Sequence, residues 1–185
     1  MRDAIPYIRG EKQGRVVAIT FDDGFRSVFD VAAPILNQYR FTATNYIVTN
    51  QIGGRNEWDL PLGSMPAPCM NKDELKKWLD MGHELGGHTL DHVNLNNVSA
   101  AEATRQIAQS REVLETTFDV EVSSFAYPYG AQSPIHRDIV RDAGYKNAGI
   151  VERRKAGRDD DPYGLPRITV RRADTLLHFL WKVLR

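Results

Sequence analysis

Two adjacent carboxylates and a closely spaced pair of histidines are the groups in this chain best suited to chemistry. Asp22 and Asp23 stand together in T-F-D-D-G. Adjacent acids repel each other, so one hypothesis assigns one carboxylate to a metal ion and the other to proton transfer. The competing interpretation is a cap for the helix that follows. His88 and His92 lie four residues apart in H-T-L-D-H, and on a helical turn that spacing would let both imidazoles share a metal.

Strands and helices that could position these groups alternate along the chain. Apolar and β-branched runs predict strands at residues 15–20, 42–48, 123–126, 145–150 and 167–170. Amphipathic spacing and N-cap signals predict helices at residues 27–39, from Asn71, from Ser99 to about Phe118, at 134–143 and at 175–184. The alternation implies a parallel sheet with right-handed crossovers, either closed into a barrel or open.

Three polar clusters stand where the carboxyl ends of strands are predicted. The acidic pair follows the first strand, the histidines follow the short run Glu84–Gly86, and Tyr127–Gly130 follows the strand at 123–126. The carboxyl ends of parallel strands meet at one edge of a sheet, where active sites of such folds are built. We therefore expect these clusters to come together in one site.

The composition is that of a globular enzyme and excludes several other classes. The chain has 185 residues, a formal net charge of zero and one cysteine, Cys69. A single domain over residues 1–185 is the expectation at this length. Zero net charge argues against nucleic-acid binding, and one cysteine excludes an internal disulfide. No apolar run approaches the roughly 18 residues of a membrane span, and residues 1–12 lack a signal-peptide pattern, which predicts a cytoplasmic location if the chain is complete.

Three motifs, read in order, resemble one known family. T-F-D-D-G at 20–24, H-T-L-D-H at 88–92 and F-A-Y-P-Y-G at 125–130 resemble those of the polysaccharide deacetylases with a NodB homology domain, carbohydrate esterase family four. The resemblance covers residues 15–170. It implies an α/β fold in which parallel strands form a distorted, TIM-barrel-like (β/α) barrel. It also implies a hydrolase that removes N-acetyl groups from an acetylated saccharide or polysaccharide.

The resemblance also implies a role for each matching position. Asp22 would be the general base, and Asp23, His88 and His92 would hold one divalent ion. Zinc is the expected ion, with cobalt, nickel or iron as alternatives. Water activated at the metal would attack the acetyl carbonyl, and the backbone N–H of Tyr129 would stabilise the resulting oxyanion.

One departure from the family pattern concerns the base. The family usually places an arginine in the third motif to hold the catalytic aspartate, and this chain has Ala126 there. Arg167, in L-P-R-I-T-V, follows Pro166, which restrains its backbone. The F-A-Y-P-Y-G motif resembles that of a family branch in which a late P-R supplies the guanidinium, so the resemblance implies that Arg167 pairs with Asp22 and replaces the missing arginine. Its planar fork can grip one carboxylate edge. The competing interpretation is a surface arginine on an edge strand.

A second departure concerns the acid that protonates the leaving amine. The family supplies it from a late leucine-x-histidine motif, and His178 matches that motif in letters only. Its predicted helix carries an apolar stripe, and His178 lies on the opposite, polar face with Lys182 and Arg185. We therefore predict that no histidine here is the leaving-group acid, which disfavours N-deacetylation more than O-deacetylation.

Several other residues have alternative interpretations. Thr89 is expected to orient the neighbouring histidine. His83 is predicted to be a packing residue and His136 a residue on a solvated helix. Asp91 is expected to face water rather than a ligand imidazole. Trp58, in the Gly- and Pro-rich loop at 50–70, either offers a surface for stacking sugars or packs the loop onto the barrel.

Three alternative functions remain open at this point. An O-acetyl carbohydrate esterase would use the same groups on the same scaffold. A catalytically impaired saccharide-binding protein would account for the missing acid motif. An iron(II) oxygenase is the third, because two histidines and one carboxylate also form the facial triad of that class, although its strands are expected to be antiparallel.

Overall fold

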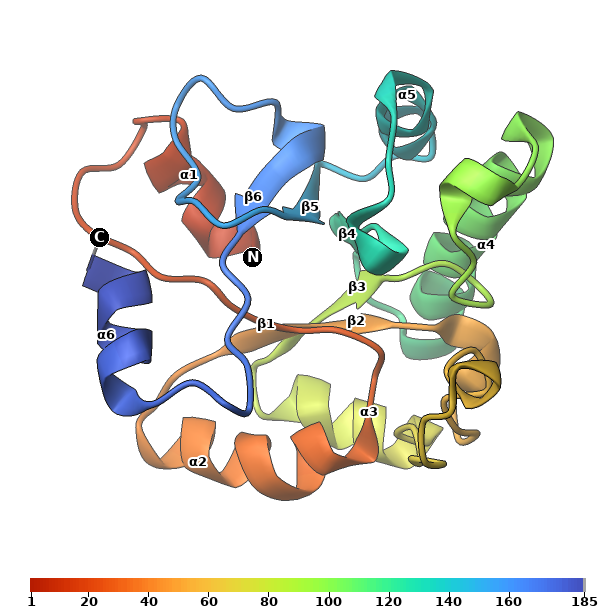
Figure 1. Cartoon of the computed structure of the whole chain (residues 1–185), viewed down its shortest axis with the longest axis horizontal. Coiled ribbons are helices and arrows are strands. Elements are labelled where there is room, and N and C mark those ends of the chain that lie inside the picture. Colours follow the sequence, from red (N-terminus) through yellow and green to blue (C-terminus); the bar gives the residue numbers. More distant parts are fainter. Residues whose placement is uncertain (185) are drawn as a thin grey trace.

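The structure, a computed structural model that describes residues 1–184, is built around one sheet of six parallel strands (Figure 1). The strands are hydrogen-bonded in the order in which they occur in the sequence. They are β1 (Ile19–Phe21), β2 (Ala43–Ile47), β3 (Glu84–Gly87), β4 (Ser124–Ala126), β5 (Asn147–Val151) and β6 (Leu165–Arg167). The sheet curls into a half-barrel, which confirms the predicted distorted (β/α) barrel of parallel strands.

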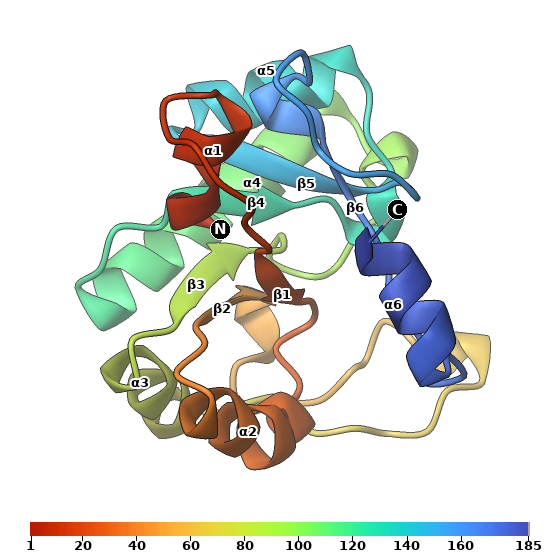
Figure 2. The same cartoon turned by 90° about the vertical axis from the view of Figure 1, so that its left-hand side faces the viewer.

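Helices cover the outer side of the curled sheet (Figures 1 and 2). The covering helices are α2 (Ala33–Gln38), α3 (Lys72–Asp80), α4 (Ala100–Phe118) and α5 (Pro134–Asp142). Helix α1 (Ile5–Ile8) precedes the first strand, and α6 (Leu176–Leu184) follows the last. Fully buried apolar side chains of α3 and α4, such as Trp78 and Leu114, form the core with Phe125 of β4. Burial of this apolar surface holds the layers together.

The helix starts predicted at Asn71 and Ser99 are present. Asn71 caps α3 with a complete capping box, in which its side chain and that of Glu74 each accept from the other's backbone N–H. Ser99 caps α4 by accepting from the backbone N–H of Glu102. These caps confirm the short-range part of the sequence interpretation, because a capping box is a contact between residues only three positions apart.

Both edge strands differ from their predicted positions. The first was expected at residues 15–20 as a buried strand, but β1 begins at Ile19, and Val16 and Val17 are exposed. The last was expected at residues 167–170, but β6 ends at Arg167 and includes Pro166. Proline lacks an N–H and is tolerated at the edge of a sheet. As a result, Arg167 stands at the carboxyl end of its strand rather than at the beginning.

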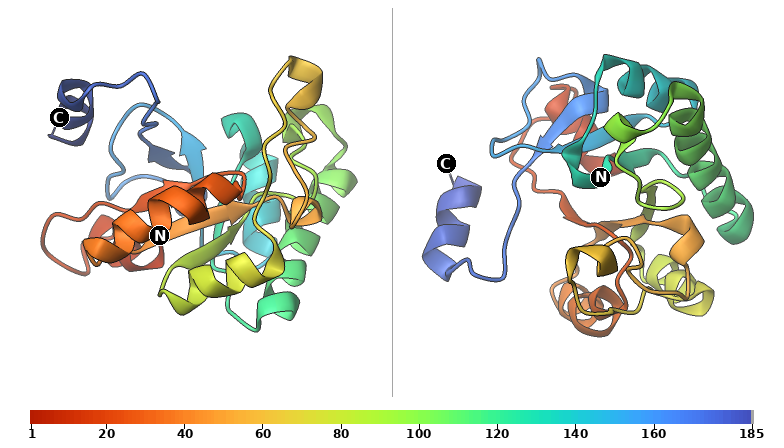
Figure 3. Two further views of the ribbon diagram at one scale, coloured as in Figure 1. Left: turned by 90° about the horizontal axis from the view of Figure 1, so that it is seen from below. Right: turned by 45° about the vertical axis from the view of Figure 1, so that its right-hand side comes forward.

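Helix α6 is present as predicted, but its apolar stripe is not covered. It stands apart from the rest of the molecule (Figure 3), and none of its described residues is buried. Lys182 ties it to the preceding segment by contacts with Asp174 and the carbonyl of Thr169. His178 is exposed, as predicted, whereas Arg185 lies outside the described residues. Within residues 1–184, no helix has both the length and the apolar character needed to cross a bilayer.

Candidate active site

The acidic pair and the histidine pair meet at the carboxyl ends of β1 and β3. Asp23 Oδ1 lies 3.4 Å from Nε2 of His88 and 3.2 Å from Nε2 of His92. One ligand atom from each of these residues lies within 4.8 Å of the others. A divalent ion needs such a convergence of carboxylate and imidazole donors. The three side chains expected to share a metal therefore do come together.

The turn that brings the histidines together is not the helical turn expected from their spacing. Residues 88–92 lie outside any helix, and Thr89 and His92 have positive φ angles of 66° and 58°. Thr89 Oγ1 accepts a hydrogen bond from the backbone N–H of His92 at 2.9 Å. This contact closes the turn, so Thr89 orients His92 through the backbone.

Backbone strain is concentrated at the same place. Six non-glycine residues in the described chain have positive φ, and four of them belong to this cluster: Asp23, Thr89, His92 and Tyr129. Left-handed backbone is costly for residues with a side chain and persists only where surrounding contacts enforce it. Such residues gather at functional sites, which gives an indication of function that is independent of any motif.

Hydrogen bonding fixes which nitrogen of His88 is free. Nδ1 of His88 lies 2.7 Å from the backbone carbonyl of Ala126, and a carbonyl can only accept, so Nδ1 carries the proton. Nε2 then presents its lone pair toward Asp23. This is the arrangement in which a neutral imidazole binds a metal ion, and the three donors therefore fit a divalent ion.

Two aromatic rings confine His92, and sequence reasoning anticipated only part of this arrangement. The Trp58 ring stacks on that of His92 at 4.7 Å between centroids, and the Tyr129 ring meets it edge-on at 4.6 Å. Trp58 also lies against Phe25 at 6.2 Å. Of the two interpretations of Trp58, these contacts favour the one in which its ring packs the loop onto the barrel. The side chain of Tyr129 was missed, because only its backbone N–H was considered.

Asp22 faces a different partner. NH1 and NH2 of Arg167 donate to its two carboxylate oxygens at 2.6 and 2.8 Å. Burial alone would raise the pKa of Asp22, but the adjacent Arg167 guanidinium holds that pKa below its ordinary value. The predicted pairing is therefore present, and Asp22 is ionised and able to accept a proton.

The Asp23 carboxylate is ionised for a related reason. Burial opposes the charge of Asp23, but its contacts with His88 and His92 hold the pKa of the carboxyl well below its usual range. In the same way, burial opposes a charge on His88, yet the nearby Asp23 and Asp22 carboxylates raise its pKa overall. Because Arg167 offsets the charge of Asp22, the Asp23 carboxylate is the unpaired negative charge that faces the two imidazoles, which suits a cation.

The remaining histidines lie outside this cluster, and one was predicted wrongly. His83 packs on the Trp78 ring at 4.0 Å and accepts from the backbone N–H of Ala43, as expected of a packing residue. His136 was expected on a solvated helix face but is buried, with Nδ1 at 3.1 Å from Oγ of Ser133. His136 stands three and four residues before Ile139 and Val140, which pack into the core, so its helical spacing was the signal that could have indicated its burial.

Two further residues, Asp91 and Cys69, lie outside the Asp and His cluster. Asp91, expected to face water, accepts from Gln106 at 2.7 Å and from Asn50 at 2.6 Å, and its side chain is part-exposed. The pKa of Cys69 is raised to about 12 by burial and by the nearby Asp23 charge, so the thiol stays protonated at neutral pH.

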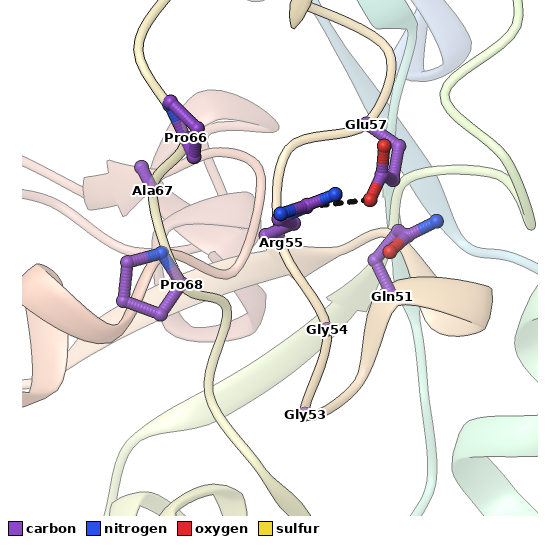
Figure 4. Close-up of a pocket in the computed structure, with 8 residues that line it drawn as sticks. All are labelled: Gln51, Gly53, Gly54, Arg55, Glu57, Pro66, Ala67 and Pro68. Atoms are coloured by element: carbon purple, nitrogen blue, oxygen red, sulfur yellow. Dashed lines mark hydrogen bonds and ion pairs between the residues drawn. The ribbon is translucent and has the colours of Figure 1, made fainter.

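A pocket of about 430 Å³ opens in the same long loop that carries Trp58. Its polar lining includes Arg55 and Glu57, which point toward each other and are joined by a hydrogen bond of 2.6 Å (Figure 4). None of the residues that line this pocket belongs to the Asp and His cluster. The pocket and the cluster are therefore separate features.

Comparison of the sequence with known proteins gives consistent matches. Residues 9–148 match the family model for polysaccharide deacetylase. The chain is 31% identical over 171 residues to a poly-beta-1,6-N-acetyl-D-glucosamine N-deacetylase of Staphylococcus aureus (strain MRSA252), covering 88% of this chain and 57% of that protein. More generally, it spans between about half and three-fifths of the length of the curated relatives that it matches.

Solved structures share the fold. IcaB from Ammonifex degensii superposes with a TM-score of 0.85 at 23% identity, covering 100% of this chain and 80% of that one. The Streptococcus pyogenes deacetylase PplD, in complex with acetate, gives a TM-score of 0.84 at 22% identity, covering 98% and 77%. At this level of identity, the likeness concerns the architecture of the sheet and its helices.

Proposed function

The chain belongs to the polysaccharide deacetylase family, and from this premise we propose that it is a metal-dependent hydrolase that removes N-acetyl groups from an acetylated polysaccharide. One observation carries the proposal. A carboxylate held by an arginine stands next to a second carboxylate that faces two imidazoles. This places a proton acceptor beside a site for a divalent ion, which is what hydrolysis of an unactivated amide requires.

We propose a polymer of N-acetylated glucosamine as the substrate class. The support is the name of the Staphylococcus aureus relatives, poly-beta-1,6-N-acetyl-D-glucosamine N-deacetylase. Saccharides commonly bind through aromatic faces and polar side chains. Tyr129, half-exposed beside the His92 ring, offers such a face at the site.

In this proposal, Asp23, His88 and His92 hold the ion, most simply zinc. When bound, the ion would polarise the acetyl carbonyl and lower the pKa of a coordinated water. Asp22 takes a proton from the attacking water while Arg167 keeps its carboxylate oriented. The fork occupies one edge of the carboxylate, and the remaining lone pairs are left for the water.

The products of this proposed reaction are acetate and a free amine. Attack on the carbonyl carbon gives a tetrahedral oxyanion, to which the backbone N–H of Tyr129 donates. Collapse breaks the C–N bond, and Asp22 returns its proton to the departing nitrogen, so that acetate and a free amine are released. This route needs no histidine as leaving-group acid.

The proposal is tested by acetate release from metal-loaded protein. N-acetylated glucosamine polymers and O-acetylated glycans are compared at matched acetyl concentration. Release from the N-acetylated polymer supports the proposal, and release from the O-acetylated glycans alone assigns the chain as an O-acetyl esterase. Binding of either glycan without turnover assigns it as a saccharide-binding protein. The iron-oxygenase alternative does not fit the fold, because every ladder between the named strands is parallel.

Metal content separates the proposed roles of the two adjacent acids. Alanine at His88 or His92 should strip most of the metal and abolish acetate release, because each removes one of three protein ligands. Asp22→Asn should keep the metal while the rate falls by about a hundredfold or more, because the proton acceptor is lost. A His88→Ala protein that retains a full equivalent of metal would contradict the ligand assignment.

A further inference from the structure

We infer that Tyr46 is a positioning residue that keeps the Arg167 guanidinium aligned on Asp22. Tyr46 lies on β2, and its side chain is completely buried. Its ring faces the Arg167 guanidinium, with 5.2 Å between Cζ and the ring centroid. The inference deepens the proposed function, since it concerns the orientation of the proposed base.

Hydrogen bonds hold Arg167 along one edge only. NH1 and NH2 grip Asp22, and NH1 also lies 3.3 Å from Oγ1 of Thr20. Nε is buried, and within residues 1–184 it has no hydrogen-bond partner. Bonds at the two terminal nitrogens alone leave the planar group free to tilt about the line that joins them. Something other than a hydrogen bond must hold the flat face.

The Tyr46 ring supplies that contact. A guanidinium stacked within about 6 Å of an aromatic centroid is attracted by the ring quadrupole, and the attraction grows when the pair is shielded from water. Here the ring is fully buried and the Arg167 side chain is only 13% exposed. This attraction resists movement of the guanidinium away from its place over the ring, because such movement weakens the interaction with the ring quadrupole.

The space for this arrangement exists because two neighbouring positions lack side chains. A Cβ added at Gly149 would lie 2.7 Å from Cδ and Nε of Arg167. A Cβ added at Gly86, the register partner of Tyr46 on β3, would collide with the Tyr46 ring. Neither glycine has a positive φ, so backbone conformation does not call for glycine at either position. Glycine is needed instead because Arg167 lies close to Gly149 and the Tyr46 ring lies close to Gly86.

The experiment compares Tyr46→Leu, which removes the ring, with Tyr46→Phe, which keeps it. Steady-state acetate release, metal content and melting temperature are measured for both. We expect Tyr46→Leu to lower kcat by about tenfold with KM and metal content unchanged, and Tyr46→Phe to stay within about twofold of the parent. Leu114→Ala, a buried cavity-forming change in α4, controls for lost stability and should leave kcat unchanged.

An Arg167→Ala background tests whether Tyr46 acts through the arginine. There, Tyr46→Leu should lower kcat less than twofold further, because the group that it positions is absent. Crystal structures give a second readout that does not depend on activity. In Tyr46→Leu, Arg167 should lose at least one of its two contacts with Asp22, and in Tyr46→Phe it should keep both.

The outcomes separate this inference from the proposed function. A parent protein that releases no acetate from any glycan overturns the proposed function, and the crystal structures still decide the inference. An active parent whose Tyr46→Leu variant keeps its kcat and both Arg167 contacts overturns the inference alone. Equal losses in Tyr46→Phe and Tyr46→Leu, or additive losses in the Arg167→Ala background, also overturn it.

Discussion

The guanidinium of Arg167 at the end of β6 and the carboxylate of Asp22 just after β1 form a two-point ion pair between the two edge strands of the sheet. No ladder joins β1 to β6 in the part of the chain that the structure describes. The pair therefore links the two unpaired edges of the half-barrel. The same contact that orients the proposed base also ties the last strand to the first.

Arg167→Lys should lower kcat by at least about tenfold with little change in KM. Lysine keeps the positive charge but is a point donor, and it cannot grip both carboxylate oxygens as the planar fork does. Arg137→Lys is the matched control, because Arg137 pairs with Asp161 away from the site. Steady-state acetate release checks both variants. A kcat for Arg167→Lys within twofold of the parent would show that the fork is dispensable.

Trp58→Leu should weaken metal binding by about tenfold or more. Trp58 stacks on the His92 ring, and loss of a group that orients a metal ligand typically costs tenfold to a hundredfold in affinity. Competition with a chelator measures the affinity. Tyr39→Leu serves as the control, because Tyr39 is an exposed ring stacked on Phe41. Both residues precede β2, at the amino ends of the strands, whereas the site lies at the carboxyl ends. Equal affinities in Trp58→Leu and the parent would refute this role.

His178→Ala should leave kcat/KM within about threefold of the parent. His178 is exposed on α6, where its backbone N–H and Nδ1 engage Thr175. Removing a true general acid typically costs about a hundredfold. Acetate release measured at unchanged metal content decides whether His178 is a surface residue or a general acid. A loss of the larger size would mean that α6 folds over the site during turnover and supplies the acid.

His83→Gln should reduce the loss of stability on acidification. Burial lowers the pKa of His83 below its ordinary value of 6.5. The unfolded chain therefore binds a proton at His83 as the pH falls through about 6.5, while the folded chain does not. Protonation thus favours unfolding, and stability is lost below that pH.

Melting temperatures between pH 7.5 and 5 measure this effect. Glutamine can still accept from the Ala43 N–H through its amide oxygen, so His83→Gln should give a flatter profile than the parent. His178→Gln, at an exposed position, is the control and should follow the parent profile. Parallel profiles for His83→Gln and the parent would exclude His83 as a source of acid sensitivity.

Features that depend on neighbours in sequence could be predicted without a structure. The capping box of Asn71 and Glu74, the adjacency of Asp22 and Asp23, and the strand ends that precede the polar clusters all fall in this class. Each arises from hydrogen bonding or side-chain periodicity over a few residues. The Arg167–Asp22 contact joins distant residues, and it was anticipated only through the resemblance to a family branch in which a late Pro-Arg supplies the guanidinium.

Other features depend on how distant segments pack, and only the tertiary structure decided them. His88 and His92 meet through a strained turn rather than a helix. The Trp58 ring packs on His92, and the Tyr46 ring packs against Arg167, because the curl of the sheet brings separate strands and loops close together. The sequence by itself determined which chemical groups are present and that the three polar clusters follow strands. Their distances and ring contacts depend on closure of the half-barrel, in which residues up to 147 positions apart must fit together at once.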